Sequence, residues 1–230
     1  IPWGGRSRLA KALLVPIIGM LLLRFISLSS DESQGVLLMS FLFAAQILLF
    51  TIFAVTCHRL VLLGDDSVPP YGLQTWTGRE TRFVGWFLEL IFIFVAITIL
   101  LVVPLGFMGS LLGGGDSQPL WFMYLFCIPG LYVLSRLSII LPAIAIDKRE
   151  DLLWAWRVSK GNGGRLFIVA GILPVLFSLI QIIPSLYAKS LLVHILVGLL
   201  GFVLMAVEMT ALSLSYQVLR KDGINATITE

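Results

Sequence analysis

The chain has 230 residues, of which 58% are hydrophobic and 13% are charged, and its formal net charge is +3. An ordinary soluble domain is about 25% charged, and even a compact fold leaves roughly a quarter to a third of its surface in contact with solvent. This composition excludes a water-soluble fold, so lipid must be the solvent for much of the chain.

Six apolar segments follow one another along the chain. A bilayer core of about 30 Å needs about 20 apolar residues of helix, and segments of this length without alternation are helices and not barrel strands. The sequence therefore predicts a single all-α membrane domain of six transmembrane helices. We place them at residues 9–28, 35–57, 83–108, 119–146, 166–187 and 190–219.

Polar residues gather in the long connection between the second and third spans. His58 and Arg59 come where the second span leaves the membrane, and we expect this pair to bind headgroup phosphates. Proton transfer by His58 is the alternative. Thr77 and Glu80 have the spacing of a capping box, which predicts that a helix begins there.

Three charged residues inside the later spans form a predicted intramembrane polar site: Glu89, Arg136 and Glu208. A rise of 1.5 Å per residue places Arg136 and Glu208 about 15–16 Å, and Glu89 about 9 Å, from the ends of their spans. Because a lone charge in lipid is costly, we expect Arg136 and Glu208 to pair, either as a structural contact or as a relay or headgroup site. Arg24, near the far end of the first span, is expected to snorkel.

A charged island, DKREDLLWAWRVSKGNGGRLF, separates the fourth and fifth spans. Asp147 and Glu150 have capping-box spacing, apolar residues follow at helical intervals, and Gly161 supplies a stop. The island therefore predicts a short amphipathic helix at the headgroup level. The residues expected at the membrane interface are His58, Arg59, Arg82, Trp154, Trp156, Arg157, Lys160 and Arg165.

The distribution of lysine and arginine predicts the orientation. If the N-terminus is cytoplasmic, the outer connections hold only Lys189, and two arginines lie within spans. The other basic residues are all on the cytoplasmic side: Arg6, Arg8, Lys11, Arg59, Arg79, Arg82, Lys148, Arg149, Arg157, Lys160, Arg165, Arg220 and Lys221. Both termini are therefore expected in the cytoplasm, and the basic charge indicates contact with anionic lipids and not with nucleic acid.

The segment RLSIILPAIAIDKREDLLWAWRVSKGNGGRLFIV, residues 136–169, resembles a broad group of bacterial six-span proteins. The group includes the membrane domain attached to some glycerophosphoryl diester phosphodiesterases and stand-alone proteobacterial relatives of unknown function. The shared elements are an arginine in the fourth span, a Leu-Pro-Ala turn, the amphipathic helix and a Lys-Gly…Arg-Leu-Phe start to the fifth span. The resemblance implies a multi-pass protein of the bacterial inner membrane and transfers no catalytic residues.

Three functional classes are consistent with these features. The sequence favours a non-enzymatic subunit or scaffold of a membrane assembly, with lipids or another membrane protein as partners and no cofactor or metal. The alternative is a transporter or lipid-binding protein that uses the intramembrane Arg/Glu site; against it, neither a helix broken at the midplane nor a clear pair of half-helices is predicted. An enzyme is least favoured, because nucleophile, metal and acid–base motifs are missing. The oligomeric state is left open.

Overall fold

The computed structural model describes residues 10–29, 35–69, 71, 75–111, 120–187 and 190–228, and over these residues the protein is all-helical. This confirms the predicted all-α class. The elements are α2 (Leu14–Ser29), α3 (Val36–Leu63), the 3₁₀ turn η1 (Asp65–Ser67), α4 (Gly78–Leu111), α5 (Leu120–Leu137), α6 (Ile140–Ala145), α7 (Leu152–Val158), α8 (Gly163–Phe167), the π-helical turn η3 (Ile168–Ile172), α9 (Leu173–Tyr187) and α10 (Leu191–Ile228).

Five helical stretches among the described residues are long and apolar enough to cross a membrane. They are Val36–Leu63, Gly78–Pro104, Phe126–Ala145, Gly163–Ile182 and Leu192–Lys221. The first predicted span forms α2, a shorter apolar helix of 16 residues, which at 1.5 Å per residue is about 24 Å long. The short connections at residues 30–34, 112–119 and 188–189, where the charge pattern predicts the outer surface, lie outside the described residues.

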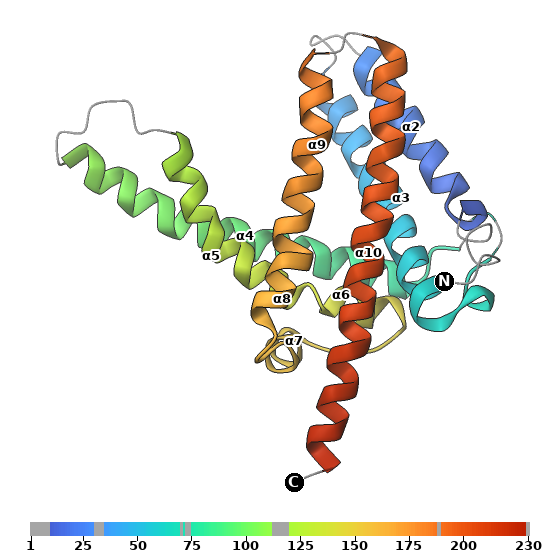
Figure 1. Cartoon of the computed structure of the whole chain (residues 1–230). Coiled ribbons are helices and arrows are strands. Elements are labelled where there is room, and N and C mark those ends of the chain that lie inside the picture. Colours follow the sequence, from blue (N-terminus) through green and yellow to red (C-terminus); the bar gives the residue numbers. More distant parts are fainter. Residues whose placement is uncertain are drawn as a thin grey trace.

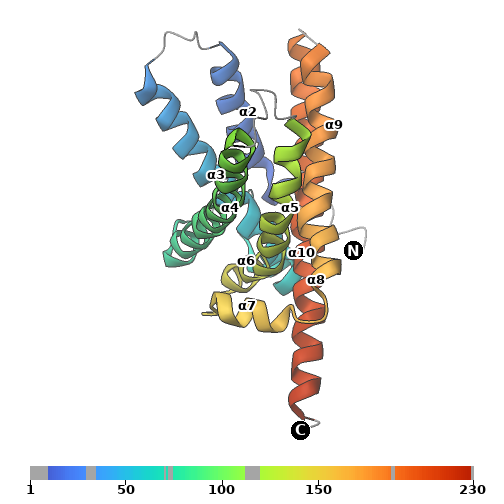
Figure 2. The ribbon, with the colours of Figure 1, turned by 90° about the vertical axis from the view of Figure 1, so that its left-hand side faces the viewer.

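The helices form an upright group and a leaning hairpin. Figures 1 and 2 show α9 and α10 side by side, with α2 and α3 next to them, while α4 and α5 pack on each other and lean away from this group. Large apolar side chains such as Phe41, Phe92 and Val203 are exposed on the outside of the helices. An exposed apolar surface of this extent fits lipid as the surrounding solvent.

The fourth predicted span is broken, contrary to the continuous helix expected over residues 119–146. Helix α5 ends at Leu137, a turn follows at residues 138–139, and α6 then begins at Ile140. Pro142 has no N–H to donate to the carbonyl of Ser138, and the N–H of Leu141 donates to that carbonyl at 3.0 Å. The tighter hydrogen bond turns the chain, so the segment after Leu137 runs through the interior.

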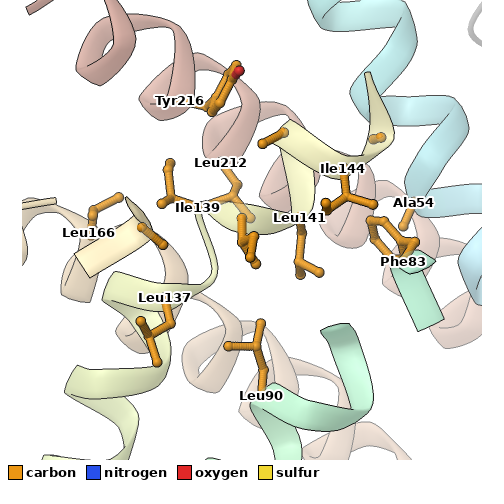
Figure 3. Packing of buried hydrophobic residues seen from close by; sticks show 14 of the residues in the cluster. Ala54, Phe83, Leu90, Leu137, Ile139, Leu141, Ile144, Leu166, Leu212 and Tyr216 are labelled. Carbon is orange, nitrogen blue, oxygen red and sulfur yellow. The ribbon is translucent and has the colours of Figure 1, made fainter. Parts of the chain in front are cut away.

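This broken segment supplies the centre of the hydrophobic core. Figure 3 shows Leu137, Ile139, Leu141 and Ile144 surrounded by side chains from the other helices. The surrounding side chains are Ala54 from α3, Phe83 and Leu90 from α4, Leu166 from α8, and Leu212 and Tyr216 from α10. Every residue from 137 to 145 is buried, so one short stretch of chain contacts four helices.

The connection from α6 to α7 differs from the predicted capping box at Asp147 and Glu150. Asp147 has a positive φ of 64°, and the N–H groups of Asp147 and Lys148 donate to Ile144 and Ala143 at 3.0 Å each. This is the hydrogen-bond pattern of a Schellman motif, so Asp147 terminates α6 and does not begin α7. The N-cap of α7 is Asp151, whose side chain accepts from the N–H of Trp154 at 2.6 Å.

Two other predicted helix signals are confirmed. The carboxylate of Glu80 accepts from the N–H of Thr77 at 2.8 Å, at the start of α4. Gly161 follows α7 with a positive φ of 81°, a conformation that glycine adopts without strain. The start of α4 and the end of α7 therefore follow from local sequence signals.

Candidate functional site

A cavity of about 600 Å³ lies among α2, α3, α9 and α10 and is the candidate site. Each helix contributes residues spaced by three or four positions, which is one helical face. The lining residues are Met20, Leu23, Arg24 and Ser27 of α2; Met39, Leu42, Phe43 and Gln46 of α3; Pro174, Ser178 and Gln181 of α9; and Gly198, Gly201, Phe202, Met205 and Glu208 of α10. We call it the polar cavity, because two charged and two amide side chains line it.

The two charged residues of the polar cavity are Arg24 and Glu208. Glu208 is half-buried near the middle of the candidate span Leu192–Lys221, and no ion pair or hydrogen bond to it is found among the described residues. Arg24 lies near the far end of α2, and it likewise has no ion pair with a described residue. A charge inside a membrane span is costly unless it is paired or faces a polar cavity. Both residues meet the second condition.

Two glycines of α10 allow polar side chains to enter the cavity. A Cβ on Gly198 would lie 3.2 Å from Leu21 and 4.0 Å from Cδ of Arg24. A Cβ on Gly201 would collide with the side-chain amide of Gln181. The absence of side chains at these positions therefore lets Arg24 and Gln181 approach the face of α10 that carries Glu208.

A π-helical turn lies next to the cavity on the α9 side. The N–H of Leu173 donates to Ile168, five residues earlier, and Pro174, which has no N–H, follows immediately and lines the cavity. Gly171 in this turn permits close packing on α5, because a Cβ there would lie 2.6 Å from Oγ of Ser135. Single π-turns of this kind occur frequently at functional sites.

The predicted pairing of Arg136 with Glu208 is wrong. Arg136 is buried against α7: its Nε donates to Oγ of Ser159 at 3.0 Å, its Nη2 donates to the carbonyl of Trp156 at 2.7 Å, and its guanidinium lies 3.6 Å from the centroid of the Trp156 ring. The depth estimate assumed a continuous helix to Ile146, whereas the break after Leu137 leaves Arg136 at the end of α5. Glu89 is exposed on α4 and does not line the cavity.

The predicted phosphate contact of His58 is also wrong, because its side chain is fully buried. Nδ1 of His58 lies 2.7 Å from Oγ of Ser213 on α10, and its ring packs 6.0 Å from that of Phe83. Nε2 of His58 has no hydrogen-bond partner among the described residues. His58 therefore ties α3 to α10 inside the protein.

Arg59 and Arg82 belong to a cluster around Asp147. Nη1 of Arg59 and Nη1 of Arg79 donate to Oδ2 of Asp147 at 3.1 and 3.3 Å, and Nη2 of Arg82 lies 3.8 Å from Oδ1. Arg59 also donates to the carbonyl of Ala145 at 3.2 Å. The cluster connects the ends of α3 and α4 to the end of α6, so these arginines have partners within the protein.

The other predicted interface residues lie in or near α7. Trp156, Arg157, Lys160 and Arg165 are exposed. Trp154 is half-buried, and its ring centroid lies 6.1 Å from that of Tyr216 on α10. A short helix therefore exists where one was predicted, as α7, with Trp154 against the core. Its exposed side carries the apolar residues Leu153 and Trp156 beside Arg157.

Sequence patterns alone did not predict that Gln46, Gln181 and Arg24 belong to the site. The sequence does contain a signal for a polar helix face. Polar residues recur at helical spacing within these apolar helices, namely Arg24 with Ser27 and Ser178 with Gln181. Which faces point toward each other depends on helix packing, and a single sequence does not specify this.

Comparisons of this chain with protein-family models, with curated proteins and with solved structures find no match. The resemblance to six-span bacterial membrane domains therefore stays a prediction. Among the described residues, no group of three or more His, Cys, Asp or Glu could hold a metal ion.

Proposed function

We propose that this protein is a six-span membrane protein that binds an amphiphilic molecule in the polar cavity, as a lipid-binding protein or transporter does. The observation that carries the proposal is Glu208, an acidic side chain in the middle of an apolar span that faces a cavity of about 600 Å³. Ligand cavities commonly measure about 300–1,000 Å³ and combine apolar walls with a few polar groups.

The shape of the site favours an amphiphile over a fully polar solute. Gln46, Gln181 and Glu208 are half-buried, whereas Met39 and Phe43, which also line the cavity, are exposed. A polar headgroup placed against the half-buried polar side chains leaves an apolar chain beside the exposed ones. The break between α5 and α6 and the π-turn η3 add helix irregularities of the kind that transporters often contain.

The proposed setting is the bacterial inner membrane with both termini in the cytoplasm, which rests on the basic residues around α7 and in the connection after α3. In this orientation α7 lies at the cytoplasmic headgroup level, and the polar cavity extends from the outer end of α2 to the middle of α10. Labelling of single cysteines from each side of sealed vesicles tests the orientation. Labelling of an exposed α7 position only from the outer side would reverse it.

Native mass spectrometry of protein extracted together with its membrane lipids tests the binding function. We expect a defined bound mass on the unchanged protein and on Glu89→Gln, which removes an exposed carboxylate outside the cavity. We expect the occupancy of that mass to fall in Glu208→Gln, because the side chain that faces the cavity loses its charge. Equal retention by all three proteins contradicts the proposal.

A subunit role is the competing proposal from the sequence. A second protein at fixed stoichiometry, bound equally to the unchanged protein and to Glu208→Gln, would favour it.

A further inference from the structure

We propose that the ligand of the polar cavity carries a zwitterionic headgroup, with its anionic group at Arg24 and its ammonium group at Glu208. This inference rests on the proposed binding function and specifies the chemistry of the ligand. Phosphate with a primary ammonium is the chemistry that fits best, in a lipid or in a free solute.

The two charges lie at different levels of one cavity. Arg24 reaches α10 at Gly198, since a Cβ there would lie 4.0 Å from Cδ of Arg24. Glu208 is ten residues further along α10, which is about 15 Å at 1.5 Å per residue. The charges are thus separated along the axis of α10 and do not form an ion pair with each other or with another described residue.

The helix directions turn both side chains toward the middle of the cavity. Figures 1 and 2 show α2 and α10 running in opposite directions. In a helix each Cα–Cβ bond tilts toward the N-terminus. Arg24 therefore leans toward the level of Glu208, and Glu208 leans toward the level of Arg24, so that a ligand between them faces a positive group at one end and a negative group at the other.

Two amide side chains also line the cavity, and that of Gln181 lies between the levels of the two charges. Gln181 lies against Gly201, one helical turn from Gly198, and Gln46 lines the cavity from α3. An amide offers both a donor and an acceptor, so it accommodates either end of a dipolar headgroup. Arg24, Glu208 and the two amides together give the cavity a positive end, neutral polar groups and a negative end.

Charge balance decides between ligand classes. Among the residues that the structure describes, the cavity lining contains one arginine and one glutamate, and no other charged residue. An anionic headgroup would pair with Arg24 and leave Glu208 without a partner in a poorly solvated site, and a cation would do the reverse. A zwitterion pairs both, and leaving a buried charge unpaired is strongly unfavourable.

The test uses nanodiscs that contain equal amounts of phosphatidylethanolamine and phosphatidylglycerol with identical acyl chains, followed by native mass spectrometry of the released protein. Both lipids carry a phosphate, but only the first carries an ammonium. We expect the unchanged protein and Glu89→Gln to retain phosphatidylethanolamine preferentially, by about tenfold, since a charge-assisted hydrogen bond contributes a factor of this order. We expect Glu208→Gln to lose the preference while still binding lipid. Arg24→Gln should bind both lipids weakly, and Arg24→Lys should restore binding.

Other outcomes overturn the zwitterion inference, alone or together with the proposed binding function. Preferential retention of phosphatidylglycerol, or no preference in the unchanged protein, overturns the zwitterion inference and leaves amphiphile binding intact. No bound lipid, together with no protection of the protein by soluble phosphoethanolamine against thermal unfolding, overturns both. Displacement of bound lipid by soluble phosphoethanolamine assigns the site to a free zwitterion, and retention of the lipid assigns it to the lipid headgroup. Thermal unfolding of each variant in the same nanodiscs shows that it is folded.

Discussion

The guanidinium of Arg136 lies 3.6 Å from the ring centroid of Trp156 and donates a hydrogen bond to the carbonyl of the same residue at 2.7 Å. One side chain thus joins the last turn of α5 to the C-terminal part of α7 through the face of a ring and a backbone acceptor. A stacked arginine of this kind is not replaceable by lysine without loss, because lysine lacks the planar fork.

Replacing Arg136 with Gln should lower the stability of the protein by about 1–3 kcal/mol, because the Ser159 hydroxyl and the Trp156 carbonyl lose a charged donor. The measurement is the unfolding midpoint in detergent. Arg157→Gln is the matched control, since Arg157 is exposed on α7 next to Trp156 and its replacement should cost less than about 0.5 kcal/mol. Equal effects of the two changes would contradict the contact between α5 and α7.

The changes Arg136→Leu and Glu208→Leu should have additive effects on the free energy of unfolding. The two side chains have separate surroundings, α7 for Arg136 and the polar cavity for Glu208, and distant sites usually add within about 0.5 kcal/mol. A double-mutant cycle measures the coupling. Recovery of stability in the double variant would show that the two charges pair after all.

Asp147 combines a left-handed backbone conformation with three arginine contacts, and two substitutions separate these contributions. Asp147→Gly keeps the conformation free of strain and removes the carboxylate. Asp147→Ala removes the carboxylate and also places a β-carbon in a conformation that costs about 1–2 kcal/mol. We therefore expect Ala to destabilise more than Gly, by about 1 kcal/mol, in chemical denaturation. Lys148→Ala, at an exposed neighbour, should change little.

The start of α7 can be located by hydrogen exchange at the backbone N–H of Trp154. Asp151 accepts from this N–H at 2.6 Å, and removing an N-cap costs about 1 kcal/mol. Asp151→Ala should therefore speed exchange of the Trp154 amide by roughly fivefold. Glu150→Ala is the control and should leave the rate unchanged, whereas acceleration only by Glu150→Ala would restore the capping box predicted from the sequence.

Gly201→Ala should reduce both stability and ligand occupancy, because the added carbon collides with Gln181 inside the polar cavity. Gly85→Ala is the matched control: a Cβ added to this helical glycine would meet nothing within 4 Å, and alanine there should stabilise α4 by up to about 1 kcal/mol. Thermal unfolding and native mass spectrometry of the two variants measure both effects. A neutral Gly201→Ala would mean that Gln181 moves away without consequence.

The sequence by itself determined the all-α class, five long apolar helices, the capping box at Thr77 and Glu80, and the short helix after residue 150. These features depend on local properties, namely the length of an apolar run and the spacing of capping groups along one segment. Asp147 shows the limit of local reasoning. Its position before α7 suggested an N-cap, but it ends α6 instead, and its carboxylate contacts three arginines.

Only the tertiary structure decided which polar residues meet. Because Pro142 has no N–H, the carbonyl of Ser138 accepts from Leu141 instead, and the fourth span breaks after Leu137. The break leaves Arg136 at the end of α5, where it contacts α7 and not Glu208. Conversely, Arg24 and Glu208 come from segments more than 180 residues apart and share a cavity because Gly198 and Gly201 let α2 and α9 side chains approach α10. Depth along a helix follows from residue counting, but contact across a bundle depends on how helices turn, break and pack, and that is a property of the whole fold.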